Sequence, residues 1–173
     1  MSYAEQFVIA NNLFPADAIL LKKKFAGMFD HFAIYLGRHP HTNEPLFAAN
    51  YTKGVSIIEP HEANQFLQKL EPEKIERFTG NQEQRRSAIE RAISMKGKRS
   101  YHLIFNNCEH YKNFVQFGKK YSKQVDKFGT GAMLTGGATA IAGLASKNSK
   151  LTIAGLALLA LGGIAKSAAN QDK

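Results

Sequence analysis

Hydrophobic and polar residues alternate over the first two thirds of the chain in a way that predicts short strands. The relevant runs are rich in β-branched and aromatic residues, and Gly, Pro or a polar cluster ends each of them. The predicted strands cover residues 18–21, 32–36, 45–51, 55–58 and 101–105. Because the first four follow one another through short connections, they favour an antiparallel sheet.

Helical periodicity is clearest over residues 82–95, where apolar residues recur on one helix face with polar residues opposite. The residues of this face are Ala88, Ile89, Ala92 and Ile93. Residues 61–70 predict a shorter helix, and a further helical pattern begins at Cys108. The sequence therefore predicts an α+β domain, a small antiparallel sheet with helices packed on it.

The composition changes sharply near residue 128. Residues 129–169 consist almost entirely of Gly, Ala, Leu, Ile, Thr and Ser, and contain two apolar stretches at 132–145 and 151–165. Each stretch is shorter than the roughly 20 residues that a membrane-spanning helix needs. We therefore divide the chain into a domain over residues 1–125 and a hydrophobic, membrane-associating segment over 129–169.

Small residues recur at every fourth position along the first apolar stretch, and two glycines eight residues apart lie in the second. They are Gly131, Thr135, Thr139 and Gly143, followed by Gly155 and Gly163. Such spacing lets two helices approach closely in lipid. We expect a C-terminal helical hairpin that dips into a membrane, and the alternative is a helix pair packed on the domain or on another subunit.

The net charge of +9 indicates an attraction to anions such as anionic lipid, nucleic acid or an acidic partner. The lysines are spread along the chain and form no aromatic-interleaved stripe, so we expect no nucleic-acid partner. Residues 1–12 show no basic patch followed by an apolar core, so we expect no secretory signal and a location at the cytoplasmic face of a membrane. One cysteine cannot form an internal disulfide.

Cys108 is the single cysteine, and it lies in the segment Phe-Asn-Asn-Cys-Glu-His-Tyr at residues 105–111. Asparagine favours helix caps, and two asparagines precede the thiol at the start of a helical pattern. Main-chain N–H groups and the helix dipole at such a position stabilise the thiolate over the thiol. Cys108 is therefore a candidate nucleophile.

A cysteine nucleophile needs an imidazole within reach as its base. The six histidines are His31, His39, His41, His61, His102 and His110. His39 and His41 lie in a polar loop, and His110 points away from the sulfur because successive helical residues are rotated by about 100°. His31 opens an otherwise apolar strand, where burial requires a partner, and is the preferred base.

Residues 29–37, Phe-Asp-His-Phe-Ala-Ile-Tyr-Leu-Gly, and residues 106–111, Asn-Asn-Cys-Glu-His-Tyr, together resemble the lecithin:retinol acyltransferase family. That family includes the HRAS-like suppressor phospholipase/acyltransferases and belongs to the NlpC-type papain-like superfamily. The resemblance covers roughly residues 13–120. The histidine precedes the cysteine, which is the circularly permuted order of this family, so the resemblance implies a permuted papain-like fold.

The resemblance also implies roles for individual residues. Cys108 would take an acyl group as a thioester, and His31 would be the general base. The family's acyltransferases carry a second histidine on the next strand, and the resemblance places Asn50 at that position in this chain, a departure from the pattern. An asparagine can still orient the imidazole, as in Cys-His-Asn sites. Tyr35 shares the His31 face, where core packing is the preferred interpretation and lining of the site the alternative.

The function implied is a thiol acyltransferase or phospholipase that passes a phospholipid acyl group to water or an acceptor at a membrane surface. One alternative is an NlpC-type cysteine peptidase or amidase, which an asparagine in the third position favours. Another is a non-catalytic membrane-interacting protein. A further alternative is zinc binding by Cys108 and histidines, but the chain lacks the ligand spacings that are typical of zinc sites. We therefore expect no metal or cofactor.

Overall fold

The computed structural model describes the chain except residues 26–28, 52, 99–106 and 171–173. The chain forms two compact units, Met1–Lys119 and Lys120–Lys173. The division lies a few residues before the composition change near residue 128. The strand predicted at residues 101–105 lies outside the described residues.

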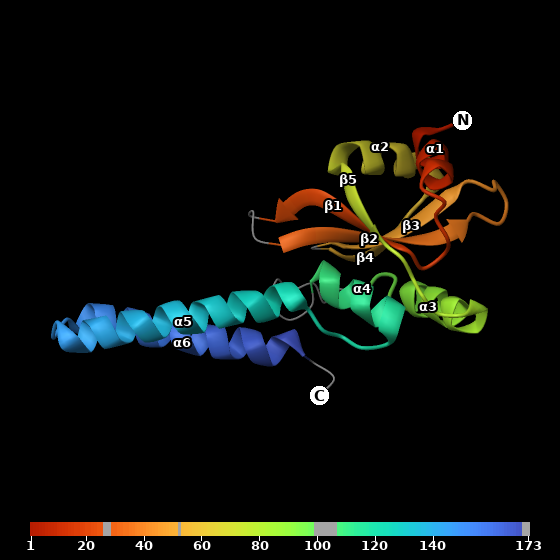
Figure 1. The fold of residues 1–173 in the computed structure, drawn as a ribbon. Helices are drawn as coiled ribbons and strands as arrows, with labels where there is room; N and C mark the ends of the chain where they lie inside the picture. The colour runs from red at the N-terminus through yellow and green to blue at the C-terminus, as the bar shows by residue number, and fades with distance from the viewer. Residues whose placement is uncertain (26–28, 52, 99–106, 171–173) are drawn as a thin grey trace. The chain divides into compact units, whose positions relative to one another are not determined.

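In its described residues, the first unit is built on a five-stranded antiparallel sheet with the strand order β4-β3-β2-β1-β5 (Figure 1). The strands are β1 (Ala18–Phe25), β2 (Phe29–Arg38), β3 (Pro45–Tyr51), β4 (Gly54–Ile58) and β5 (Pro72–Glu76). The α+β prediction is confirmed. Strand β5 was not predicted because its sequence, Pro-Glu-Lys-Ile-Glu, is mostly polar, as suits a strand at the edge of a sheet.

Four helices cover the two faces of this sheet. They are α1 (Tyr3–Ala10), α2 (Pro60–Leu70), α3 (Gln82–Ser94) and α4 (Cys108–Phe117). Helices α1 and α2 lie on one face, and α3 and α4 on the other (Figure 1). The sequence predicted α2 and α3 to within one residue at each end and missed α1.

A hydrophobic core lies between each face of the sheet and the helices that pack on it. Strand β2 contributes alternate residues to the two cores. Ala33 and Tyr35 belong to the core under α1 and α2, and Phe32 and Ile34 to the core over α3 and α4. This is the period of two expected of a strand buried on both faces. Tyr35 is buried and its ring lies 5.4 Å from that of Phe47, so it packs in the core as preferred from sequence.

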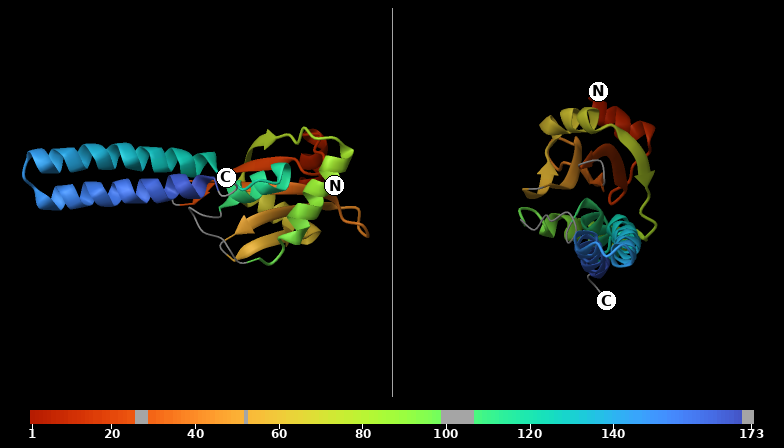
Figure 2. Two further views of the ribbon diagram at one scale, coloured as in Figure 1. Left: turned by 90° about the horizontal axis from the view of Figure 1, so that it is seen from below. Right: turned by 90° about the vertical axis from the view of Figure 1, so that its left-hand side faces the viewer.

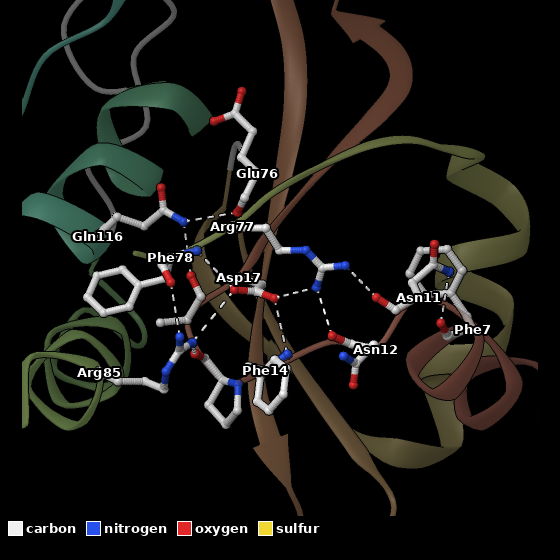
Figure 3. A network of polar contacts seen from close by, with 12 residues as sticks. Phe7, Asn11, Asn12, Phe14, Asp17, Glu76, Arg77, Phe78, Arg85 and Gln116 are labelled. Carbon is white, nitrogen blue, oxygen red and sulfur yellow. Dashed lines mark hydrogen bonds and ion pairs between the residues drawn. The ribbon is translucent and has the colours of Figure 1, made fainter. Parts of the chain in front are cut away.

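A buried carboxylate, Asp17, ties the start of β1 to the segment after β5 (Figure 3). Its two oxygens accept hydrogen bonds from the main-chain N–H groups of Phe14 at 3.1 Å and Phe78 at 2.9 Å. Arg77 pairs with the same carboxylate at 2.8 Å, and Arg85 lies 3.6 Å from it. These contacts satisfy a charge that would otherwise be costly to bury.

The second unit is a hairpin of two helices, α5 (Lys123–Ala145) and α6 (Ser149–Ala169), which lie side by side in both views of Figure 2. The predicted hairpin is confirmed. With 23 and 21 residues, both helices exceed the apolar stretches read from the sequence, because capped polar segments at Ser122 and Asn148 begin them earlier. By length and composition, both are long and apolar enough to cross a membrane.

The glycines at the contact between α5 and α6 recur every seven residues. They are Gly129, Gly136 and Gly143 on α5, with Gly155 and Gly162 on α6. A Cβ at Gly136 would lie 2.6 Å from the main-chain N of Leu159, so only glycine permits this approach. Gly131 and Gly163, which the spacing of four had placed on the contact face, have nothing within 4 Å of such a Cβ.

Candidate active site

Helix α4 begins with a capping box that places Cys108 at its first position. The N-cap residue Asn107 has extended backbone, and its side-chain oxygen accepts from the main-chain N–H groups of Glu109 at 3.0 Å and His110 at 3.1 Å. In return, the N–H of Asn107 donates to Nδ1 of His110 at 3.4 Å. The predicted helix start is thereby observed, and His110 serves the cap.

Polar contacts along α4 hold the helix against the rest of the unit. Lys112 pairs with Glu76 of β5 at 2.6 Å, and Gln116 donates to the carbonyl of Ala16 at 3.0 Å. At the last turn, Arg91 of α3 donates to the carbonyls of Phe114 and Val115. Contacts from β5, from Ala16 and from α3 therefore hold helix α4, and Cys108 is the first residue of that helix.

The structure brings His31 and Cys108 together, with Nδ1 of the imidazole 2.8 Å from Sγ. His31 is half-buried near the start of β2, opposite Leu21 of β1, and Cys108 is only 2% exposed. A general base must lie within hydrogen-bond reach of the proton it removes, and this pair meets that requirement.

The thiol also donates to the main-chain carbonyl of Asn50 at 3.1 Å. The last described pair between β2 and β3 joins Ala33 to Ala49, so the Asn50 carbonyl lies just beyond the end of this ladder. A carbonyl oxygen favours the thiol over the thiolate, whereas an imidazole and a helix N-terminus favour the thiolate.

The Asn50 side chain is buried, and its amide donates to the carbonyl of Asn107 at 3.5 Å. The sequence had assigned the Asn50 side chain the role of orienting His31, and that role stays a prediction. Asn50 therefore lies in the site, but it reaches Cys108 through its backbone and the α4 cap through its amide. Its side-chain bond is long for a hydrogen bond.

Tyr51 is the site residue that the sequence interpretation missed. Its ring centroid lies 5.1 Å from that of His31, with the planes tilted by 41°. Burial raises the pKa of the Tyr51 hydroxyl, and the nearby charges of Cys108 and Glu62 raise it further. Strand periodicity could have suggested Tyr51, because residues 47, 49 and 51 of β3 share a face opposite residues 35, 33 and 31 of β2.

The His39 side chain stabilises the loop that follows β2. Nδ1 of His39 accepts from the main-chain N–H groups of His41 and Thr42, which closes the loop between β2 and β3. Seven strand residues lie between His31 and His39, so their backbones are roughly 25 Å apart along β2. His39 therefore lies far along β2 from the contact between His31 and Cys108. His102 lies outside the described residues.

In the described ranges, no group of three or more His, Cys, Asp and Glu residues could hold a metal ion. The chemistry that the described site offers is that of a cysteine with an adjacent imidazole.

The family model of lecithin retinol acyltransferase matches residues 12–121. The chain belongs to the lecithin retinol acyltransferase family. The match contains His31, Asn50 and Cys108, and it ends before the hairpin of α5 and α6. Membership of the lecithin retinol acyltransferase family indicates an enzyme of acyltransferase type that acts on lipid substrates. No curated protein matches the chain.

Proposed function

We propose that this protein is a cysteine-dependent acyltransferase or phospholipase that takes an acyl group from a phospholipid as a thioester on Cys108. The observation that carries the proposal is the 2.8 Å separation between Nδ1 of His31 and Sγ of Cys108 at the first residue of α4. Family membership supports an acyl substrate over a peptide.

In the first half of the reaction, His31 removes the thiol proton and the sulfur attacks the ester carbonyl carbon. The S–C bond forms, and the carbonyl electrons move onto the oxygen. The main-chain N–H of Cys108, at the first turn of α4, is the donor we assign to this oxyanion. When the oxyanion collapses, the C–O bond to the glycerol breaks and the imidazolium returns the proton to the departing alcohol.

In the second half, water or another hydroxyl or amine acceptor attacks the thioester. His31 now removes a proton from the acceptor as its bond to the acyl carbon forms, and the proton passes back to sulfur as the S–C bond breaks. Asn50 is the third residue of the proposed site. Its carbonyl holds the resting thiol, and its amide supports the N-cap residue Asn107.

The hairpin of α5 and α6 is proposed to hold the enzyme in a membrane, where its substrate is found. Large apolar side chains on both helices are at least half exposed. They are Leu134, Ile141, Leu144, Ile153, Leu156 and Ile164. Lys147 and Lys150 lie at the turn of the hairpin, where they suit lipid headgroups. Orientation toward the cytoplasm is part of this proposal.

The test is the mass of the protein after brief incubation with mixed phospholipids and an acid quench. The expected result is an increment of one acyl chain on Cys108, removed by hydroxylamine because the linkage is a thioester. Cys108→Ala should lack the adduct, and His31→Ala should form it far more slowly. Lys74→Ala, on β5, is the matched control. Fatty-acid release that persists in Cys108→Ala would overturn the proposal, and cleavage of a peptide amide without any acyl adduct would favour a peptidase.

A further inference from the structure

Tyr51 joins the reactive pair to a groove on the first unit. It is the last residue of β3, where its ring contacts the His31 imidazole on one side. On the other side, the Tyr51 ring meets the edge of Phe66 of α2, with centroids 6.4 Å apart and planes at 80°. The imidazole is therefore backed by two aromatic rings in succession, one from the sheet and one from a helix.

The groove lies between β4 and α2 and has a volume of about 360 Å³. Its lining includes the apolar or aromatic side chains of Tyr51, Ile57 and Phe66 and the polar side chains of Glu62, Gln65 and Lys69. Glu62 and Lys69 are both exposed and lie two turns apart on α2, roughly 10 Å along the helix axis. In the part of the chain that the structure describes, neither forms an ion pair.

The Tyr51 hydroxyl makes no hydrogen bond with any described residue, although its ring is largely buried. Because burial and neighbouring negative charge raise its pKa, the phenol keeps its proton and remains a donor. A donor of this kind, on a residue that lines both the groove and the reactive pair, is suited to contact a molecule bound in the groove.

We propose that the groove binds the headgroup of a zwitterionic phospholipid, and that Tyr51 aligns this bound headgroup with the His31–Cys108 pair. Lys69 faces the phosphate, Glu62 faces the ammonium group, and the Tyr51 hydroxyl donates to a headgroup or glycerol oxygen. The Tyr51 ring is a positioning element for His31. The inference rests on the proposed lipid acyl transfer and names where its substrate is held.

Binding is tested without turnover, using the full-length Cys108→Ala protein in detergent micelles and glycerophosphocholine as the probe. The expected result is saturable binding that weakens at least fivefold in Lys69→Met and in Glu62→Gln. Lys74→Met, on the opposite edge of the sheet, is the matched control and should bind normally. Inorganic phosphate alone should bind more weakly, because it lacks the group that faces Glu62. Equal affinity in Lys69→Met, or no saturable binding, would overturn the headgroup assignment.

The role of Tyr51 is tested by comparing Tyr51→Phe with Tyr51→Leu. The first readout is the pH profile of Cys108 alkylation by iodoacetamide, which needs no lipid and reports on His31, with the Tyr51 and Glu62 side chains nearby. Tyr51→Phe keeps the ring, so it should leave this profile unchanged and raise KM for phospholipid several-fold. Tyr51→Leu should shift the alkylation profile and lower kcat as well. Circular dichroism checks that both variants are folded.

The outcomes separate the two proposals. Headgroup binding that depends on Lys69, in a protein that forms no acyl adduct, would support the groove and overturn the reaction. An acyl adduct on Cys108 with kinetics unaffected by Lys69→Met and Tyr51→Phe would support the reaction and overturn the groove. An alkylation profile that is identical in Tyr51→Leu and the unmodified protein would overturn the positioning role.

Discussion

Asn107 and His110 exchange hydrogen bonds across the first turn of α4, with the Asn107 side chain accepting from the His110 N–H at 3.1 Å and the Asn107 N–H donating to His110 Nδ1 at 3.4 Å. Cys108 lies between them, so its φ and ψ angles are set by a closed ring of contacts. The carbonyl of the cap residue Asn107 also accepts a hydrogen bond from the Asn50 side-chain amide. One local motif therefore fixes both the helix start and the direction of the thiol.

Replacing the cap residue should reduce both stability and thiol reactivity. Asn107→Ala removes the acceptor for two N–H groups, and loss of such a cap costs about 1 kcal/mol in the free energy of unfolding. Urea denaturation measures this cost, and the iodoacetamide rate at Cys108 should fall as the helix end frays. Asn107→Asp keeps the acceptor and should restore stability. A reactivity that is unaffected by Asn107→Ala would show that the cap does not position the sulfur.

Substitution of Asn50 distinguishes a backbone role from a side-chain role. Asn50→Ala keeps the carbonyl that accepts from the thiol and loses the side-chain amide that donates the long bond to Asn107. We expect kcat/KM to fall less than about tenfold, equivalent to about 1.4 kcal/mol. The comparison is His31→Ala measured on the same lipid. If the two variants were equally inactive, Asn50 would act through its side chain on the imidazole.

Removal of the buried carboxylate should destabilise the first unit strongly. Asp17→Ala leaves the N–H groups of Phe14 and Phe78 without their acceptors, in addition to breaking the pair with Arg77. Breaking a buried pair costs about 3 kcal/mol. Glu5→Gln, which breaks the exposed pair with Arg38, is the matched control and should cost less than about 1 kcal/mol. Urea unfolding curves for both variants give the comparison, and similar losses would contradict it.

Two glycines of α5 should respond in opposite ways to the same substitution. Gly136→Ala places a methyl group 2.7 Å from the carbonyl oxygen of Gly155, so the helices must separate and the hairpin should be destabilised. Gly131→Ala meets nothing within 4 Å and should stabilise the helix by about 1 kcal/mol. Helix content during denaturation in detergent micelles measures both effects. Equal effects would mean that α5 and α6 do not pack through their glycines.

Alkaline pH should lower the free energy of unfolding through the buried tyrosines. Burial raises the pKa of Tyr111 above its ordinary value of 10.0, and Tyr51 shifts in the same direction. Above pH 10 the unfolded chain releases phenol protons that the folded chain retains, so this stabilisation is complete below pH 10 and is lost as pH rises toward the folded pKa. At about pH 11 the loss is about 1 kcal/mol for each tyrosine.

The control for this pH dependence is Tyr111→Phe, which has no phenol proton to release. It loses the hydrogen bond from the hydroxyl to the carbonyl of Ala92 and should be less stable at neutral pH. Its free energy of unfolding should nevertheless decline less steeply above pH 10. A decline as steep as that of the unmodified protein would exclude Tyr111 as a contributor.

The sequence pointed to His31 and Cys108, which the structure places 2.8 Å apart, and much of their surroundings could not be predicted. The helix cap and the apolar strand flanking His31 are local patterns, and local patterns identify both Cys108 and His31. The role of Asn50 depends on which of its atoms meets the sulfur. Residue type does not reveal a backbone contact, so the sequence suggested a side-chain role for Asn50 and gave no sign of the contact between its carbonyl and the thiol. To predict that Tyr51 lies beside His31, one must know the register between β2 and β3. The loop that joins these strands leaves their register undetermined in the sequence.

The same limit explains the misassigned elements of the fold. Strand β5 is polar because it pairs on one side only, so it lacks the apolar signal that revealed β1 to β4. In α5, small residues occur at spacings of both four and seven. The sequence alone does not decide which set faces α6, because the choice depends on how the two helices cross. Gly129, Gly136 and Gly143 make the contact, while Gly131 does not.

The position of the sulfur beyond Ala33 and Ala49 has a consequence for how this site tolerates change. One more pair between β2 and β3 would set Phe32 against Asn50, whose carbonyl now accepts from the thiol. That pair would compete with Cys108 for the Asn50 carbonyl. The proposed reaction therefore depends on this carbonyl remaining available to the sulfur.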